Sequence, residues 1–279
     1  MTRVHRVLFL LALAALAHTV QAATASRFTD LEGSPNLRSA SALVVDARGN
    51  IIYGKDVDTV RPIASITKLM TAMVILDSGV DLDERITVTK ADRDLVQMTG
   101  SRLEYGATLS RREMILLAIM SSENRAASAL GRTWPGGLEA FVAQMNAKAA
   151  ELGMQHSHFA DPAGLLVENQ STARDLNRMV NAALNYALIR EASTTQRLEV
   201  RPYKNRGALT YANTNRLLKN ESWDIALSKT GYINEAGRCL VMQATIEGEP
   251  VSIVLLNSFG KLTPFGDSNR LRKWMLAGR

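Results

Sequence analysis

Short apolar segments bounded by turn residues occur near both ends of the chain. Ala42–Asp46 and Ile51–Tyr53 lie on either side of Arg48–Asn50, a polar segment with a central glycine. This arrangement predicts a β-hairpin. Three more strands are predicted in the final third of the chain, over Ile225–Lys229, Gly237–Ile246 and Pro250–Ser258, with a tight turn at Glu247–Glu249.

The middle of the chain has the apolar spacing of helices. Residues 65–77 form a helix that is apolar on most of its surface and ends at Gly79. Ser110 and Glu113 form a capping box at the start of an apolar run that reaches Met120. Further helices are predicted over Gly137–Leu152, Thr172–Ile189 and Asp267–Leu276.

Together these elements predict an α/β (α+β) fold in which one antiparallel sheet is assembled from both chain ends, with flanking helices and an inserted, mostly helical lobe. We expect a single catalytic domain over residues 26–279. Its sheet lobe would span about residues 37–80 and 195–279, and its helical lobe about 81–194. The chain has 279 residues, of which 46% are hydrophobic, and this is ample for a packed core.

The first 25 residues have a different character. Arg3 and Arg6 precede the apolar run Val7–Ala17, and small residues follow. This predicts a secretory signal peptide, cleaved near Ala22 or Ala25, and therefore a periplasmic protein. An uncleaved anchor is the alternative, although the run is short for a bilayer.

The overall charge changes this picture little. The formal net charge is +6, and loss of the two leader arginines would leave +4 (6 − 2), spread along the chain. Nucleic-acid binding is therefore not predicted. No long amphipathic tail follows Trp274, so we expect no stable membrane anchor.

Cysteine and histidine usage points away from redox or metal chemistry. Cys239 is the only cysteine, so no internal disulfide can form, and we expect it to be a small buried residue of a strand. His156 and His158 lie two positions apart beside a helix end and are predicted to be in a surface loop. We expect neither a metal nor another cofactor.

Three short motifs carry the candidate chemistry: Ser65-Ile66-Thr67-Lys68, Ser122-Glu123-Asn124 and Lys229-Thr230-Gly231. Singly they mean little, because the chain also contains a Ser-x-x-Lys at Ser258–Lys261 and a Ser-x-Asn at Ser34–Asn36. Their order and position distinguish them from these chance matches.

Each motif falls on a fitting element. Ser65 and Lys68 share a face of the predicted helix, so their side chains should touch. Ser65 as a simple N-cap with a surface Lys68 is the structural alternative. Ser122 and Asn124 follow a helix directly, where local capping would also explain them. Lys229–Gly231 is placed at the end of an apolar strand, where glycine allows close backbone approach.

With these motifs the chain resembles the penicilloyl-serine transferases, and more narrowly the low-molecular-mass penicillin-binding proteins. These are serine D-alanyl-D-alanine peptidases, and the endopeptidase type is the most similar. The resemblance covers roughly residues 37–260. Supporting segments are Pro62–Thr71, Met120–Ala126, Ser171–Asp175 and Asn213–Leu218.

The resemblance implies catalytic roles for Ser65, Lys68, Ser122 and Asn124. Ser65 would be the nucleophile, Lys68 its base, Ser122 a proton relay and Asn124 an orienting amide. Substrate-binding residues would be Lys229, Thr230, Gly231 and Tyr232. The oxyanion hole would consist of the backbone N–H groups of Ser65 and Tyr232.

One difference from the class A β-lactamases limits the activity that we expect. The second motif reads Ser-Glu-Asn, and no Glu-x-x-Leu-Asn segment supplies the deacylating carboxylate of class A β-lactamases. We therefore expect β-lactams to be inhibitors and peptidoglycan peptides to be the substrate. A D,D-endopeptidase that cleaves cross-links is the leading hypothesis. A D,D-carboxypeptidase, a β-lactamase and a catalytically silent wall-binding protein remain alternatives. Protein partners are not predictable from the sequence.

Overall fold

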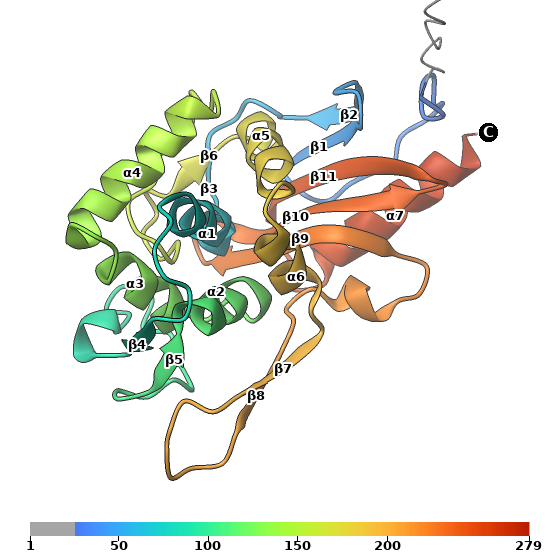
Figure 1. Cartoon of the computed structure of the whole chain (residues 1–279). Coiled ribbons are helices and arrows are strands. Elements are labelled where there is room, and N and C mark those ends of the chain that lie inside the picture. The colour runs from blue at the N-terminus through green and yellow to red at the C-terminus, as the bar shows by residue number, and fades with distance from the viewer. Residues whose placement is uncertain (1–25, 279) are drawn as a thin grey trace, which may run out of the picture.

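A computed structural model describes residues 26–278, so the expected signal peptide lies outside the described residues. Its central feature is a five-stranded antiparallel sheet in the order β2-β1-β11-β10-β9. The strands come from both chain ends, as predicted (Figure 1). They are β1 (Ser41–Asp46), β2 (Ile51–Lys55), β9 (Asp224–Ile233), β10 (Gly237–Ile246) and β11 (Glu249–Ser258).

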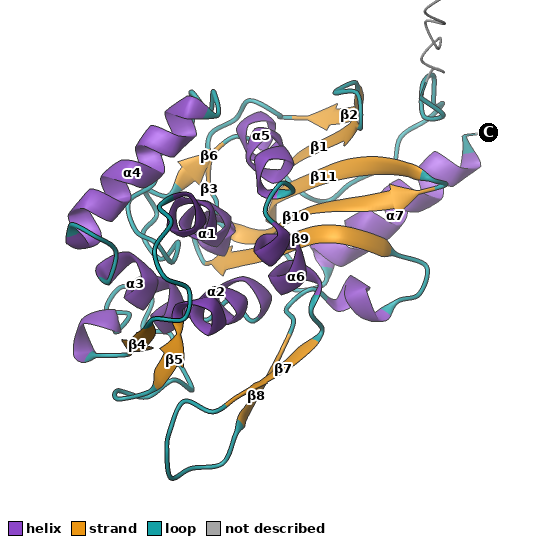
Figure 2. Ribbon diagram, in the orientation of Figure 1, coloured by secondary structure: helices purple, strands orange, loops and turns teal. Residues whose placement is uncertain are grey.

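Helices cover both faces of this sheet (Figure 2). The last helix, α7 (Thr263–Ala277), packs on one face, and α5 (Ala173–Ala183) packs on the other. Successive side chains of β1 point to opposite faces of the sheet, so the hydrophobic core has two parts. Val44 points into the cluster beneath α7, and Leu43 points into the larger cluster on the opposite face. Cys239 is buried in β10, as expected.

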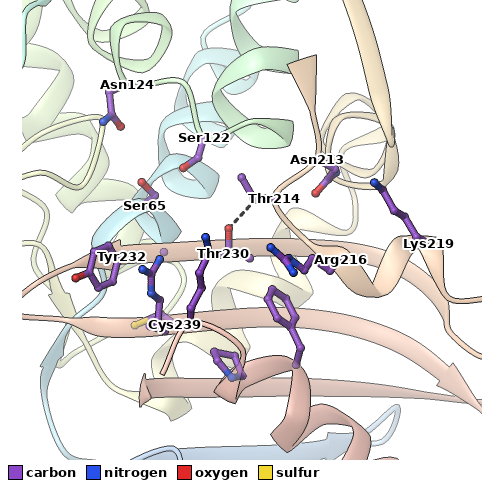
Figure 3. A pocket seen from close by; sticks show the side chains of 15 residues that line it. Ser65, Ser122, Asn124, Asn213, Thr214, Arg216, Lys219, Thr230, Tyr232 and Cys239 are labelled. Carbon is purple, nitrogen blue, oxygen red and sulfur yellow. Dashed lines mark hydrogen bonds between the residues drawn. The ribbon is translucent and has the colours of Figure 1, made fainter. Parts of the chain in front are cut away.

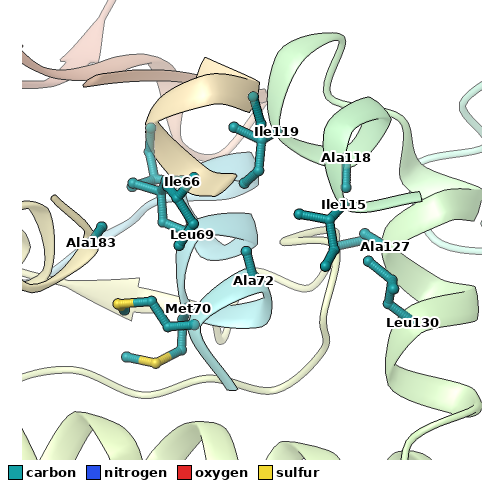
Figure 4. Close-up of a cluster of buried hydrophobic side chains, with 14 of the residues drawn as sticks. Ile66, Leu69, Met70, Ala72, Ile115, Ala118, Ile119, Ala127, Leu130 and Ala183 are labelled. Atoms are coloured by element: carbon teal, nitrogen blue, oxygen red, sulfur yellow. The ribbon is translucent and has the colours of Figure 1, made fainter. Parts of the chain in front are cut away.

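The helix α1 (Thr67–Asp77) lies at the centre of the larger core. Its residues from Thr67 to Ile75 are all buried. Figure 4 shows Leu69 and Ala72 of α1 near Ile115 of α2 (Arg111–Met120) and Leu130 of α3 (Asn124–Arg132). The capping box predicted at Ser110 is present. Because α1 is surrounded by apolar side chains, any polar group on it is removed from water.

Within residues 26–278 the remaining elements are the helices α4 (Gly137–Glu151) and α6 (Ala187–Thr194), three short strand pairs and three 3-10 turns. The strand pairs are β3 (Arg61–Pro62) with β6 (Gln170–Ser171), β4 (Arg85–Thr87) with β5 (Thr108–Ser110), and β7 (Arg197–Val200) with β8 (Leu209–Ala212). The 3-10 turns are η1 (Ala64–Ile66), η2 (Lys90–Asp92) and η3 (Arg216–Lys219). In residues 26–278, no helix is both long and apolar enough to cross a membrane.

Three predicted boundaries are wrong. The helix predicted over Thr172–Ile189 is two helices, α5 and α6 (Ala187–Thr194), because the chain turns at Leu184–Tyr186, where the Tyr186 hydroxyl donates to Asp77 of α1. That tertiary contact leaves no mark on the apolar spacing. The helix α7 begins at Thr263, with Pro264 in its first turn, rather than at Asp267.

The third correction concerns the last motif. Lys229–Gly231 does not end its strand, since β9 continues to Ile233 and remains paired with β10. The motif thus lies inside an edge strand, and one side of β9 is free of sheet partners in the described structure. This edge borders the candidate site.

Candidate active site

Ser65 lies in the turn η1, immediately before α1. The lysine Nζ of Lys68 donates to Ser65 Oγ at 2.7 Å. The N-cap position of α1 is Ile66, and that of η1 is Ile63; neither helix has a side-chain cap. Ser65 therefore caps nothing, and the structural alternative for this residue does not hold. Its side chain is half-buried and lines a cleft.

Lys68 is completely buried in α1. Besides Ser65, its Nζ donates to Asn124 Oδ1 at 2.8 Å and to the Ala163 carbonyl at 2.5 Å. Burial lowers the pKa of Lys68 to about 7, against the opposing effect of nearby carboxylates such as Asp161. A substantial fraction of neutral amine at neutral pH suits a proton acceptor.

Ser122 lies in the turn between α2 and α3, and Asn124 is the first residue of α3. Ser122 has a φ of 61°, which is uncommon for a residue with a side chain and is a form of strain that clusters at functional sites. Its hydroxyl accepts a hydrogen bond from Lys229 Nζ at 2.9 Å. This segment thus presents one side chain to each buried lysine, Asn124 to Lys68 and Ser122 to Lys229.

Lys229 enters the site from β9 and is 1% exposed. Its Nζ also donates to the Thr230 carbonyl at 2.8 Å. Burial, and secondarily the charge of Lys68, lower the pKa of Lys229 well below its ordinary value. The next side chain, Thr230, donates to Thr214 Oγ1 at 2.6 Å, a contact drawn in Figure 3.

Gly231 lets β9 approach η1 closely. A Cβ at this position would lie 2.8 Å from the Ile63 carbonyl and 3.2 Å from the Ser65 nitrogen, so any side chain would push the two segments apart. Tyr232 follows, and its exposed ring carries the Arg238 guanidinium 3.5 Å from its centroid. The backbone at Ser65 and the backbone after Gly231 are therefore neighbours, which is the proximity an oxyanion hole needs.

The loop 161–166 contributes groups that the motifs did not reveal. The Asp161 carboxylate accepts hydrogen bonds from four backbone N–H groups, those of Ala163, Gly164, Leu165 and Leu166. The loop is folded tightly around this carboxylate, and it holds the Ala163 carbonyl against Lys68. Gly164 has a φ of 74°, and a Cβ there would overlap the Ala64 carbonyl. The Asp-Pro-Ala-Gly sequence signals a turn but not its contact with Lys68.

A second unpredicted contact orients Asn124. Its Nδ2 donates to Thr99 Oγ1 at 2.8 Å, and the Thr99 hydroxyl donates to Asp94 Oδ2 at 2.6 Å. The buried Asp94 also accepts from the backbone N–H of Thr99 at 2.9 Å. With its amide nitrogen held by Thr99, Asn124 presents its oxygen to Lys68. Nothing in the sequence around residue 99 indicates this.

The site opens onto a cleft of about 670 Å³ (Figure 3). Six of the eight sequence-predicted site residues line it, and the buried Lys68 and Lys229 are connected to it by their hydrogen bonds to Ser65 and Ser122. The lining residues are Ser65, Ser122, Asn124, Asn213, Thr214, Arg216, Lys219, Thr230, Gly231, Tyr232, Arg238, Cys239, Lys261, Pro264 and Phe265. No aspartate or glutamate of the described residues lines it.

Over residues 26–278, no three His, Cys, Asp or Glu side chains form a group that could hold a metal ion. His156 and His158 are exposed near the short strand β6. The chemistry available in the cleft is that of a hydroxyl nucleophile beside a buried amine, with a second hydroxyl and a second buried amine next to it. This arrangement suits acyl transfer through a serine ester.

Known proteins are similar to this chain in both sequence and fold. The family model described as D-alanyl-D-alanine carboxypeptidase matches residues 29–260. A D-alanyl-D-alanine endopeptidase of Pseudomonas aeruginosa is 48% identical over 87% of this chain and 79% of its own length. One of Escherichia coli is 45% identical over 95% of this chain and 84% of its own. A crystal structure of a Streptomyces DD-transpeptidase superimposes with a TM-score of 0.81 at 28% identity, covering 88% of this chain and 100% of that one. This chain therefore belongs to the D-alanyl-D-alanine carboxypeptidase family of peptidases.

Proposed function

We propose that this protein is a serine D,D-endopeptidase that hydrolyses D-alanyl cross-links of peptidoglycan. The observation that carries the proposal is the buried Lys68, whose Nζ contacts Ser65 Oγ at 2.7 Å within an open cleft. Relatives that are 45% and 48% identical are endopeptidases, which supports this choice within the family. A wall substrate and the predicted leader both support a periplasmic location.

Acylation begins with a proton transfer. Neutral Lys68 takes the proton of the Ser65 hydroxyl, and Ser65 Oγ attacks the carbonyl carbon of the D-alanyl peptide bond. The carbonyl oxygen gains negative charge and is stabilised by the backbone N–H groups of Ser65 and Tyr232. When the C–N bond breaks, the leaving amine takes the proton of the Ser122 hydroxyl, and Ser122 regains one from Lys68. Lys68 is then neutral again, and an ester remains on Ser65.

Deacylation reverses these proton movements. Water loses a proton to Lys68 and attacks the ester, releasing the acid and restoring the Ser65 hydroxyl. Lys229 holds Ser122 in place through its hydrogen bond to the Ser122 hydroxyl. The free edge of β9 can align an extended peptide by main-chain hydrogen bonds. A β-lactam would acylate Ser65 in the same way, and the lack of a carboxylate in the described cleft lining favours a long-lived ester.

The substrate decides between endopeptidase and carboxypeptidase activity. The purified protein is incubated with cross-linked dimeric muropeptides and the products are separated by chromatography, with Ser65→Ala as the control. Release of monomers that the control does not release supports the proposal. Release of free D-alanine alone assigns a carboxypeptidase, and absence of both products together with absence of penicillin labelling indicates a silent wall-binding protein.

A further inference from the structure

Four cations line the catalytic cleft beyond the reacting groups: Arg216, Lys219, Arg238 and Lys261, here called the cationic wall. Their counter-charge is missing, because no carboxylate of residues 26–278 lines the cleft and none of the four forms an ion pair there. Arg238 stacks on Tyr232, and the side chains of the other three form no hydrogen bond within residues 26–278. Like charges gathered in one cleft repel one another, so this wall is suited to an anionic ligand.

Arg216 and Lys219 are held in position by the turn η3. The Asn215 side chain accepts from the Leu217 N–H at 3.0 Å, and Leu217 is buried. The preceding residue ties the turn to the catalytic groups, because the Thr214 N–H donates to the Met120 carbonyl at the end of α2. The turn is therefore fixed by a backbone hydrogen bond to α2 and by the buried Leu217 side chain.

The position of the proton relay Ser122 indicates which part of the substrate lies beside the turn η3. Ser122 delivers the proton to the leaving amine, and its hydroxyl is held on the side of Lys229 and Thr230. The leaving group thus extends from Ser65 toward Thr230 and Thr214. Figure 3 shows that this direction continues to Arg216 and then to Lys219, whereas Tyr232 lies on the other side of Ser65.

The length of the leaving group then matters. Free D-alanine carries a single carboxylate, one carbon from the leaving nitrogen, so it ends near Thr230. A leaving peptide from a cross-link continues beyond that point and carries further carboxylates. Only the longer leaving group can reach the outer end of η3.

We propose that Lys219 binds a second, distal carboxylate of the leaving peptide and so favours cross-linked peptides over peptides that end in D-alanine. The inference rests on the proposed function and names its specificity determinant. Lys219 is exposed, so its contribution is that of a surface ion pair, about threefold to fivefold in binding. It acts on binding alike in ground and transition states, and should change KM rather than kcat.

The test compares two cross-linked dimers that differ only in the distal carboxylate of the leaving peptide, free in one and amidated in the other. Lys219→Gln should raise KM for the free acid about threefold, and Lys219→Glu should raise it about tenfold, because attraction becomes repulsion. The amidated dimer should respond several times less to either change. Lys219→Arg should restore the KM of the wild type.

Lys273→Glu on the outer surface of α7 is the matched control, since it alters net charge equally at an exposed site outside the cleft. An equal KM change in Lys219→Glu and Lys273→Glu, or an equal effect on both dimers, overturns the inference while leaving endopeptidase function intact. Wild-type protein that releases no monomer from either dimer overturns the proposed function and this inference together.

Discussion

The two sides of the cleft differ in how far their cationic side chains are removed from water. The catalytic side, consisting of Ser65, Lys68, Ser122, Asn124 and Lys229, has both lysines buried and every amine hydrogen-bonded to defined acceptors. In the cationic wall, Arg216, Lys219 and Lys261 are exposed, Arg238 is half-buried, and none of the four has an ion pair in the described structure. Burial shifts a lysine toward the neutral form that can accept a proton, whereas solvent keeps a cation charged and free to meet an anion. Substitutions should therefore affect chemistry on one side and binding on the other.

The largest loss is expected for Ser65→Ala. Without the hydroxyl no ester can form, so peptidase activity should fall by about 10⁴-fold or more and covalent penicillin labelling should disappear. Labelling is followed with a fluorescent penicillin, and thermal unfolding verifies that the variant is folded. Retained labelling would remove Ser65 from the nucleophile role.

Lys68→Arg is next in size. It keeps the positive charge but supplies no neutral amine, so acylation should slow on the order of 10³-fold. Stopped-flow acylation by a chromogenic β-lactam measures this step directly. The matched variant Lys273→Arg on α7 should acylate at the wild-type rate. Near-normal acylation in Lys68→Arg would exclude Lys68 as the base.

The pH dependence tests the same amine without a mutation. Burial lowers the pKa of Lys68 to about 7, so the neutral, active form increases as pH rises through about 7. The value of kcat/KM should therefore fall about tenfold per pH unit below that point and level off above it. Measurement of kcat/KM from about pH 5 to about pH 9 suffices. The acylation rate should show the same fall below about pH 7. A flat profile across this range would contradict the assignment.

Thr99→Val should have a moderate effect. Valine has nearly the shape of threonine but cannot hold Asn124 Nδ2 or donate to Asp94, so the amide loses its fixed orientation. We expect kcat to fall about tenfold with little change in KM. Thr99→Ser keeps the hydroxyl and should recover most of the rate, which separates positioning from packing. If the valine variant keeps the wild-type kcat, Asn124 does not depend on this contact.

The smallest effect is expected from salt. Raising ionic strength from about 0.05 M to about 0.5 M should raise KM for an acidic cross-linked dimer a few-fold, because exposed cations are screened. The buried catalytic lysines are shielded from salt, so kcat should hold. A parallel loss of kcat would mean that the two sides of the cleft are not separate in function.

Some features followed from short stretches of sequence. The i, i+3 spacing of Ser65 and Lys68 on one apolar helix implies contact, and the capping box at Ser110 marks the start of α2. Other boundaries could not be predicted in this way. The division of α5 from α6 depends on the Tyr186 contact with α1, and the length of β9 depends on its pairing with β10.

The sequence alone determined the class of fold, because that follows from the periodicity of each element. It also determined the order of the three motifs and the candidate nucleophile with its neighbouring amine, because Ser65 and Lys68 are spaced three residues apart in one predicted helix. Only the tertiary structure decided which lysine amine is hydrogen-bonded to Asn124 and which to Ser122. Asn124 reaches Lys68 from 56 positions away, and Lys229 reaches Ser122 from 107. Such contacts, like that of the Ala163 carbonyl with Lys68 and like the cationic wall, arise where elements that are distant in the sequence pack together. Local spacing carries no information about that packing.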